Sequence, residues 1–274
     1  MSRIAARFDE LKAEGRAAFI PFVTAGDPSI DVAREILMGL PAAGADLIEL
    51  GMPFTDPMAD GPAVQAAGLR ALRAGATMKT TLELVRDFRK IDNDIPIVLM
   101  GYANPIFSYG VSAFANDAAA AGVDGMILVD IPPEEAAEFS PALNAAGLDA
   151  IRLSTPTTTD ARLPAVLNGA SGFLYYVSIA GVTGTKDFDP VEVEREVRRI
   201  KAQTVLPVGV GFGIKTPEHA AAIARFADAA VVGSAIVARV AAFVNADGSV
   251  SPGCAADVLG FVSELSHGVR AARA

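Results

Sequence analysis

A single glutamate interrupts one of the apolar runs of this 274-residue chain. Glu49 lies within Leu47-Ile48-Glu49-Leu50. A charged carboxylate that points into a protein interior costs several kcal/mol unless it is paired. Such burial raises the pKa of the carboxyl toward neutrality, which is the condition for a general acid–base group. The alternative is that Glu49 points outward between covering helices, which are also a poor environment for it.

Two aspartates follow this run in a loop rich in proline and glycine. Asp56 and Asp60 lie within the segment 51–62. Loop aspartates often only form turns or cap helices, so the pattern leaves both a structural and a catalytic role open.

Glycine-bearing turns end three later apolar runs, at 178–187, 211–218 and 233–240. Turns of this kind expose backbone N–H groups, and the Gly233-Ser234 pair opens a short apolar helix whose N-terminus adds a positive dipole end. We therefore predict a phosphate site here. The alternative is that these glycines only close tight turns.

The other ends of apolar runs are themselves apolar or aromatic. Each such residue alone is most often a core residue, but together they would line an apolar pocket that suits an aromatic ring. The residues are Phe22, Met100, Tyr102, Val129, Ile131, Tyr175 and Phe212.

The elements that would position these residues alternate along the chain. Several of the short runs are apolar on both faces, as in a parallel sheet covered by helices. Eight strands are predicted, at 17–23, 45–50, 95–100, 125–130, 148–153, 173–178, 206–211 and 228–233. Helices are predicted at 3–14, 30–43, 133–145, 190–201, 216–226 and 256–272, and something additional must occupy the long interval 51–94.

Eight strand-then-helix units in a chain of this length predict one (β/α)8 barrel, a single domain over residues 1–274. The first and last helices and those of the 51–94 interval are extra to the eight units. An open doubly wound sheet is the alternative. Its nucleotide-binding form requires a GxGxxG turn after the first strand, and the segment 24–29 is TAGDPS.

The composition excludes several classes of function. The net charge of −9 gives no general reason to bind nucleic acid or an anionic membrane. The one cysteine, the charged N-terminus and the absence of a long uncharged apolar segment favour the cytoplasm. Two histidines make a His/Cys zinc site nearly impossible, and no lysine lies in a predicted strand, which argues against a Schiff-base aldolase.

Four motifs resemble the tryptophan synthase alpha chain in order and spacing, from about Arg3 to the C-terminus. They are IELGMPFTDPMADGPAVQ at 48–65, MGYANPIFSYG at 100–110, SIAGVTG at 178–184 and GFGI at 211–214. The resemblance implies a TIM barrel. It also implies retro-aldol cleavage of 1-(indol-3-yl)glycerol 3-phosphate to indole and glyceraldehyde 3-phosphate.

The resemblance also implies roles for individual residues. Glu49 matches the catalytic glutamate, Asp60 the aspartate that holds the indole N–H, and Tyr175 an assisting tyrosine. The substrate-binding positions are Phe22, Met100, Tyr102, Val129, Thr183, Gly184, Phe212, Gly213, Ile214, Gly233 and Ser234, with Gly184, Gly213, Gly233 and Ser234 at the phosphate. Met100 replaces a Leu found in some relatives, a change that conserves volume, and Ile179 stands where some have Arg.

Family members work with a beta chain in an alpha2beta2 complex, and pyridoxal phosphate belongs to that partner, so no cofactor is expected in this chain. The partner would contact three parts of the chain, namely 53–60, 102–108 and the region near Pro132. The segment 178–190 would close over the substrate.

Two alternatives imply a different activity. The first is another phosphate-binding barrel enzyme. An indole-glycerol phosphate synthase would show catalytic lysines at strand ends, and a phosphoribosylanthranilate isomerase would show a strand-end Cys–Asp pair. The second is a non-catalytic partner of a beta chain, which would have no need of Glu49 and Asp60.

Overall fold

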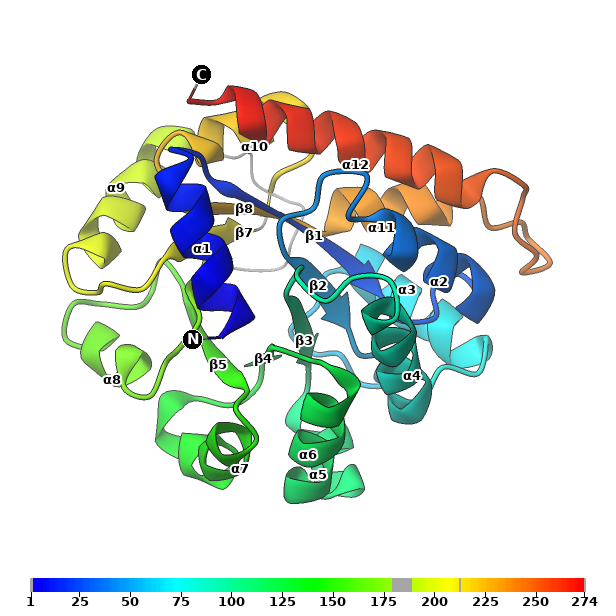
Figure 1. The fold of residues 1–274 in the computed structure, drawn as a ribbon, viewed down its shortest axis with the longest axis horizontal. Coiled ribbons are helices and arrows are strands. Elements are labelled where there is room, and N and C mark those ends of the chain that lie inside the picture. Colours follow the sequence, from blue (N-terminus) through cyan, green and yellow to red (C-terminus); the bar gives the residue numbers. More distant parts are fainter. Residues whose placement is uncertain (1, 179–188, 212, 274) are drawn as a thin grey trace.

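The strands form a closed parallel barrel in a computed structural model that describes residues 2–178, 189–211 and 213–273. Each strand pairs with the next one along the chain, and β1 closes the barrel by pairing with β8. Figure 1 shows the strands at the centre of the molecule. The strands are β1 (Ala18–Thr24), β2 (Ile48–Gly51), β3 (Ile97–Gly101), β4 (Gly125–Leu128), β5 (Asp149–Ser154), β6 (Leu174–Val177), β7 (Val208–Gly211) and β8 (Ala229–Val232).

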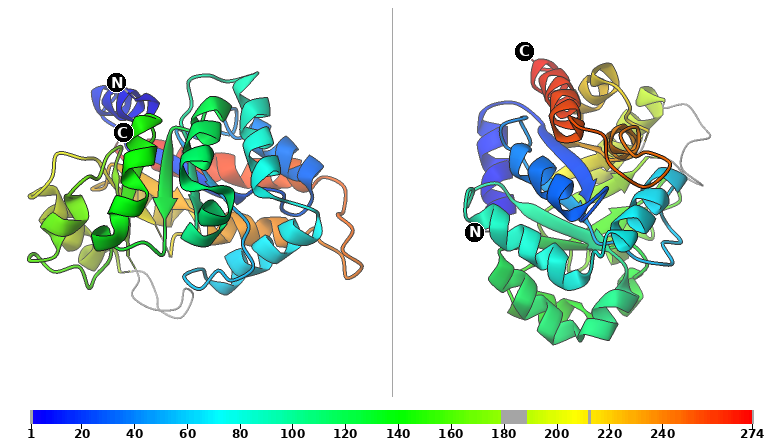
Figure 2. Two further views of the ribbon diagram at one scale, coloured as in Figure 1. Left: turned by 90° about the horizontal axis from the view of Figure 1, so that it is seen from below. Right: turned by 90° about the vertical axis from the view of Figure 1, so that its right-hand side faces the viewer.

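Helices surround the barrel, as both views of Figure 2 show. Their order along the chain confirms the predicted alternation of strand and helix, and α12 packs along α10 and α2. The helices are α1 (Arg3–Ala13), α2 (Ile30–Gly39), α3 (Pro62–Arg73), α4 (Met78–Arg89), α5 (Ala103–Tyr109), α6 (Val111–Ala121), the 3-10 helix η1 (Pro133–Glu138), α7 (Ser140–Ala145), α8 (Leu163–Leu167), α9 (Pro190–Lys201), α10 (Pro217–Ala224), α11 (Ser234–Ala241) and α12 (Cys254–Ala271).

Alternate strand residues fill two separate cores. Side chains such as Ile20, Leu47 and Val98 pack together inside the barrel, whereas their neighbours Phe19 and Ile48 pack outward against the helices. Both faces of a strand are therefore buried, which is why the strands read as continuous apolar runs in the sequence.

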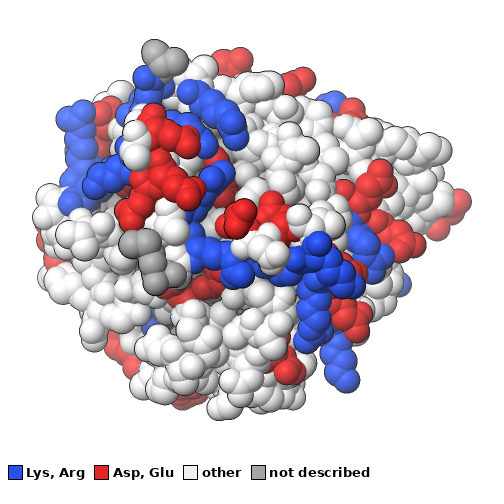
Figure 3. Space-filling model, viewed as in Figure 1, with Lys and Arg blue, Asp and Glu red and all other residues white. Residues whose placement is uncertain are grey.

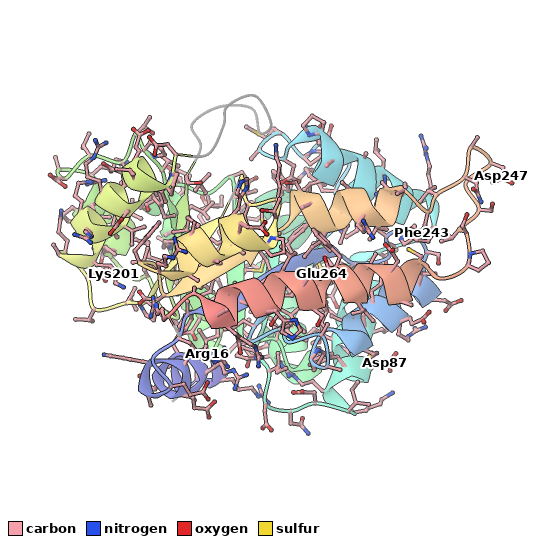
Figure 4. All side chains as sticks on the ribbon, turned by 90° about the horizontal axis from the view of Figure 1, so that it is seen from above. Arg16, Asp87, Lys201, Phe243, Asp247 and Glu264 are labelled. Atoms are coloured by element: carbon pink, nitrogen blue, oxygen red, sulfur yellow. The ribbon has the colours of Figure 1, made fainter. Side chains whose placement is uncertain are left out.

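The N-terminal end of the barrel is closed by α1 and by buried ion pairs. Ile4, Phe8 and Leu11 of α1 join the core inside the barrel. Arg16, labelled in Figure 4, donates two hydrogen bonds to Asp46, whose side chain is 0 % exposed and also accepts from the backbone N–H of Phe19. A buried carboxylate is tolerated only with such partners. The charged residues at this end of the barrel therefore serve the stability of the fold rather than catalysis.

The predicted helices differ from the observed ones at a few points. The helix predicted at 30–43 ends at Gly39, because Pro41 has no N–H to continue the hydrogen-bond pattern. The segment 133–145 is a 3-10 turn followed by α7 rather than one helix. The helices α5, α6 and α8 were not predicted, and Gly110, with a φ of 95°, separates α5 from α6.

The surface that carries α1 mixes charges of both signs. Figure 3 shows basic and acidic side chains interleaved on this face, without a field of one sign. Among the described residues, no helix has the length and apolar character needed to cross a membrane.

Candidate active site

Glu49 lies on the inner face of the barrel. It is the second residue of β2 and pairs with Phe22 of β1 and Val98 of β3. Leu47, two residues earlier, packs in the inner core, so the alternation of the strand directs Glu49 inward as well. The residue is 2 % exposed, and its Oε2 atom has no hydrogen-bond partner in the described structure. A buried carboxyl oxygen that the fold leaves unsatisfied is available to a ligand.

A cavity opens directly above Glu49, at the C-terminal end of the strands. Gly51 lies two residues after Glu49, on the same inward face of β2, and lines this cavity. The Glu49 carboxyl therefore lies one layer of inward-facing residues below the cavity. The cavity encloses about 360 Å³ of space, part of it open to solvent. Five predicted site residues line it, namely Phe22, Asp60, Met100, Tyr102 and Val129.

Sequence reasoning did not single out the rest of this lining. Thr24, Gly51, Met52 and Gly101 end the first three strands or directly follow them, so their position at strand ends was a usable signal. The further lining residues come from the loop after β2 and from α3, and nothing in the sequence places them over the barrel mouth. They are Pro53, Phe54, Pro57, Val64 and Gly68.

Small residues on the strands give the aromatic side chains their space. A Cβ atom at Gly51 would lie 2.6 Å from Cζ of Phe22, and one at Gly211 would lie 2.0 Å from the hydroxyl oxygen of Tyr175. Neither distance is compatible with a side chain at the glycine. The positions of Phe22 and Tyr175 inside the barrel therefore depend on glycine in the neighbouring strands.

Three ionisable side chains interact at this end of the barrel. Burial, and secondly the charge of Asp60, raise the pKa of Glu49 to about 8. Burial raises the pKa of Asp60 to about 6, against the lowering influence of a hydrogen bond from Tyr102. Burial and then the charge of Glu49 raise the pKa of the Tyr175 phenol. Since two carboxyls with separated pKa values share one pocket, one can be protonated while the other is ionised near pH 7.

The turns predicted to bind phosphate are only partly described. Gly213, with a φ of 80°, and the buried Ile214 follow β7, and Gly233 precedes α11, whose first residue Ser234 is exposed. Since β7 pairs with β8, these two turns are neighbours. Thr183, Gly184 and Phe212, as well as Ile179, lie outside the described residues.

Two further predictions concern acidic residues. Asp56 is exposed in the loop, where its carboxylate interacts with the neighbouring Thr55 hydroxyl, and it does not line the cavity. Within the described ranges, no group of three or more His, Cys, Asp or Glu side chains could hold a metal ion.

The fold and this pocket define a class of protein, a TIM-barrel enzyme with two carboxyls of raised pKa at the C-terminal ends of its strands. The family model for the tryptophan synthase alpha chain matches residues 8–257. A tryptophan synthase alpha chain from Acidiphilium cryptum (strain JF-5) is 56% identical over 273 residues, which cover 100% of this chain and 99% of the relative.

Solved structures agree with this match. The tryptophan synthase alpha subunit from Legionella pneumophila str. Paris is 40% identical with a TM-score of 0.90, and the alignment covers 98% of this chain and 99% of that one. A chain of tryptophan synthase from Mycobacterium tuberculosis is 37% identical with a TM-score of 0.86 over 98% of both chains. This chain belongs to the tryptophan synthase alpha chain family. It is a carbon–carbon lyase that cleaves 1-(indol-3-yl)glycerol 3-phosphate to indole and glyceraldehyde 3-phosphate, and alpha chains of this family need no cofactor of their own.

The raised pKa of Glu49 has a consequence for stability. The folded chain holds this proton up to about pH 8, whereas an unfolded chain releases it near 4.5, the ordinary pKa of a glutamate. Because the folded state binds more protons in this window, this group makes the free energy of unfolding fall as pH rises, by up to about 1.4 kcal/mol per pH unit.

We expect Glu49→Gln to remove this contribution. Between pH 5 and pH 8 the variant gains stability relative to the wild type, and the gain grows with pH. Chemical denaturation at several pH values measures it. A difference between the two proteins that does not change with pH would contradict the burial of a protonated Glu49.

Proposed function

We propose that Glu49 carries out both proton transfers of the cleavage. As a carboxylic acid it protonates C3 of the indole ring, which leaves a positive charge at the ring nitrogen. As a carboxylate it then accepts the proton of the hydroxyl group on the carbon attached to C3. That carbon becomes the aldehyde carbon of glyceraldehyde 3-phosphate, and the electrons of the broken C–C bond return to the ring. The buried, unsatisfied Oε2 of Glu49 beneath the cavity is the observation that carries this proposal.

Asp60 has the complementary role in this proposal. Its carboxylate lines the cavity and is ionised above about pH 6, so it can accept the indole N–H and stabilise the positive charge on the ring. Tyr175 assists from inside the barrel, where its phenol interacts electrostatically with Glu49. Phe22, Met100, Tyr102 and Val129 hold the ring in the cavity.

The phosphate of the substrate is proposed to bind to backbone N–H groups rather than to lysine side chains. Gly213, Ile214, Gly233 and Ser234 supply such groups from two adjacent turns, and the N-terminus of α11 adds its dipole. Thr183, Gly184 and Phe212 complete the substrate site in this proposal.

These roles predict a bell-shaped pH dependence of kcat/KM. Activity requires ionised Asp60 and, at the start of the cycle, protonated Glu49. The value of kcat/KM therefore rises through about pH 6 and falls through about pH 8, in line with the raised pKa values of the two carboxyls. Steady-state rates of the isolated chain between pH 5 and 9 measure the profile. A profile that stays flat from pH 5 to pH 9 would show that neither carboxyl titrates during catalysis.

We further propose that the chain, as one domain over residues 1–274, works in the cytoplasm in an alpha2beta2 complex with a tryptophan synthase beta chain that carries pyridoxal phosphate. The M. tuberculosis structure is described as tryptophan synthase, which supports a partner of this kind. The exposed apolar side chains of Met58 and Phe107 lie in the two segments proposed to contact it, 53–60 and 102–108, and a third contact is proposed near Pro132. The segment 178–190 is proposed to close over the substrate.

Cleavage of indoleglycerol phosphate, measured with and without a beta chain, tests the proposal. The isolated chain should release indole, and Asp60→Asn as well as Glu49→Gln should each abolish most of this release. If the wild-type chain only stimulates a beta chain and releases no indole, the second candidate, a non-catalytic partner, is correct.

A further inference from the structure

The loop that carries Asp60 has few contacts of its own. Thr55, Asp56, Met58 and Ala59 are exposed in the described structure, so apolar packing contributes little to the position of this loop. Within its own βα unit, the side-chain amide of Gln65 donates to the backbone oxygen of Asp60 at 2.9 Å. The Asp60 N–H donates to the backbone oxygen of Pro57 within the same loop, and Gln65 also donates to that oxygen at 3.4 Å. These bonds join the loop only to itself and to α3, and an accurately placed carboxylate needs more support than that.

A second anchor comes from the next βα unit. The backbone N–H of Ala59 donates to the hydroxyl oxygen of Tyr102 at 3.0 Å. Among the described residues, Tyr102 is the only hydrogen-bond partner that residues 55–60 have in another unit of the barrel. Tyr102 is itself 3 % exposed, and its ring contacts that of Phe54, with ring centroids 5.4 Å apart.

The Tyr102 hydroxyl also acts on Asp60 itself. Because its oxygen accepts from Ala59, its proton remains available to the adjacent carboxylate. A hydrogen bond from this phenol lowers the pKa of Asp60, and the charge of Asp60 in turn raises the pKa of the phenol. One hydroxyl thus holds the loop through Ala59 and favours the ionised form of Asp60.

The position of Tyr102 is set in turn by a third unit. Tyr102 is the N-cap residue of α5, and its side chain does not cap the helix. The carboxylate of Asp130, which follows β4, accepts from the first helical N–H, that of Ala103, at 3.0 and 3.3 Å. Asp130 therefore supplies the missing cap from outside the helix and fixes the backbone beside Tyr102.

We propose that Tyr102 and Asp130 are positioning residues for Asp60, forming a clamp that runs from β4 through β3 to the loop after β2. Tyr102 thereby has a role beyond that of a pocket wall, and Asp130 acts without touching the substrate. This inference rests on the proposed role of Asp60.

The test compares pH profiles of kcat/KM for conservative variants. Tyr102→Phe keeps the ring and removes only the hydroxyl, so Asp60 loses a donor to its charged form and its pKa rises. We expect the acidic limb of the profile to move up by about one pH unit, and kcat/KM to fall about fivefold at pH 6. Tyr109→Phe is the matched control, since it removes a phenol that donates to a carboxylate, Asp117, away from the cavity. Its profile should overlay that of the wild type.

Asp130 provides a second, independent test. Asp130→Ala removes the acceptor for the Ala103 N–H and should shift the acidic limb in the same direction as Tyr102→Phe. Asp130→Asn keeps an amide oxygen that can accept this hydrogen bond and should restore most of the wild-type profile. A merely structural role would lower kcat at all pH values without moving the limb.

Asp60→Asn separates the two ways in which the idea can fail. If Asp60→Asn is inactive but the Tyr102→Phe and Asp130→Ala profiles overlay that of the wild type, the clamp is wrong and the role of Asp60 stands. If Asp60→Asn keeps full activity, the proposed role of Asp60 is wrong and the clamp fails with it.

Discussion

Turnover of indoleglycerol phosphate falls by at least about 100-fold when Glu49 is replaced by Gln, the low end of the effect of a general acid–base group. Gln has nearly the same shape but neither donates nor accepts a proton in the reaction. The other carboxyl of the pocket, Asp60, is proposed to hold the indole N–H, so it is not placed to take over the proton transfers of Glu49. The measurement is single-turnover release of indole at saturating substrate.

Binding and folding should survive this change. The affinity for a non-cleavable indole-phosphate analogue should remain within a few-fold of the wild-type value, since the ring and the phosphate are held by other residues. Glu83→Gln, at an exposed position of α4, makes the same chemical change outside the site and should leave turnover unaltered. A Glu49→Gln variant that retains a tenth or more of wild-type turnover would exclude the proposed role.

Binding of a beta chain should raise the rate of cleavage in this subunit. In return, a ligand bound in the substrate site should strengthen the association of this chain with the beta chain. The loop after β2 carries Asp60 at the cavity and the exposed Met58 on its outer side. A partner that binds the ordered loop better stabilises the state in which Asp60 is in place. Linkage makes the effect reciprocal, and couplings of this kind are typically about 1–3 kcal/mol, or roughly 5- to 150-fold.

The alpha–beta dissociation constant, measured with and without the indole-phosphate analogue, tests this coupling. We expect the analogue to tighten association by a factor in that range. Met58→Ser should weaken association, whereas Val205→Ser should not, because Val205 is equally an exposed apolar residue but precedes β7 at the opposite end of the barrel. Equal dissociation constants, together with an unchanged cleavage rate in the complex, would refute the coupling.

The strands and most of the helices could be predicted because their signals are local. A strand buried on both faces is apolar throughout, as the runs at 17–23 and 95–100 are, and the closed order of the strands confirms the barrel that these runs predicted. The helix at 190–201 was predicted with its observed bounds, since Asp189 caps it and Pro190 opens it.

The short helices α5 and α8 could not be predicted in the same way. They have seven and five residues, too few for a helical periodicity to appear, and each contains a proline. Packing against the barrel, rather than intrinsic preference, stabilises segments of this length.

The sequence also drew attention to the carboxyl on which the proposed site depends. An acidic residue within an apolar strand is costly enough to imply a function, and this argument singled out Glu49 without any knowledge of its neighbours. Asp60 was more ambiguous, because an aspartate in a proline-rich loop has common structural roles.

What the tertiary structure alone decided is how these groups interact. Glu49 and Asp60 are 11 residues apart in the chain and Tyr102 is a further 42 residues on, and no local pattern shows that the phenol lies against the loop or that Asp130 holds the helix beside it. The pKa of a carboxyl depends on the water removed around it and on the charges and donors that the fold brings near it. Periodicity and composition describe the chain one segment at a time, whereas these environments are produced only when neighbouring strands place their ends together at one edge of the barrel.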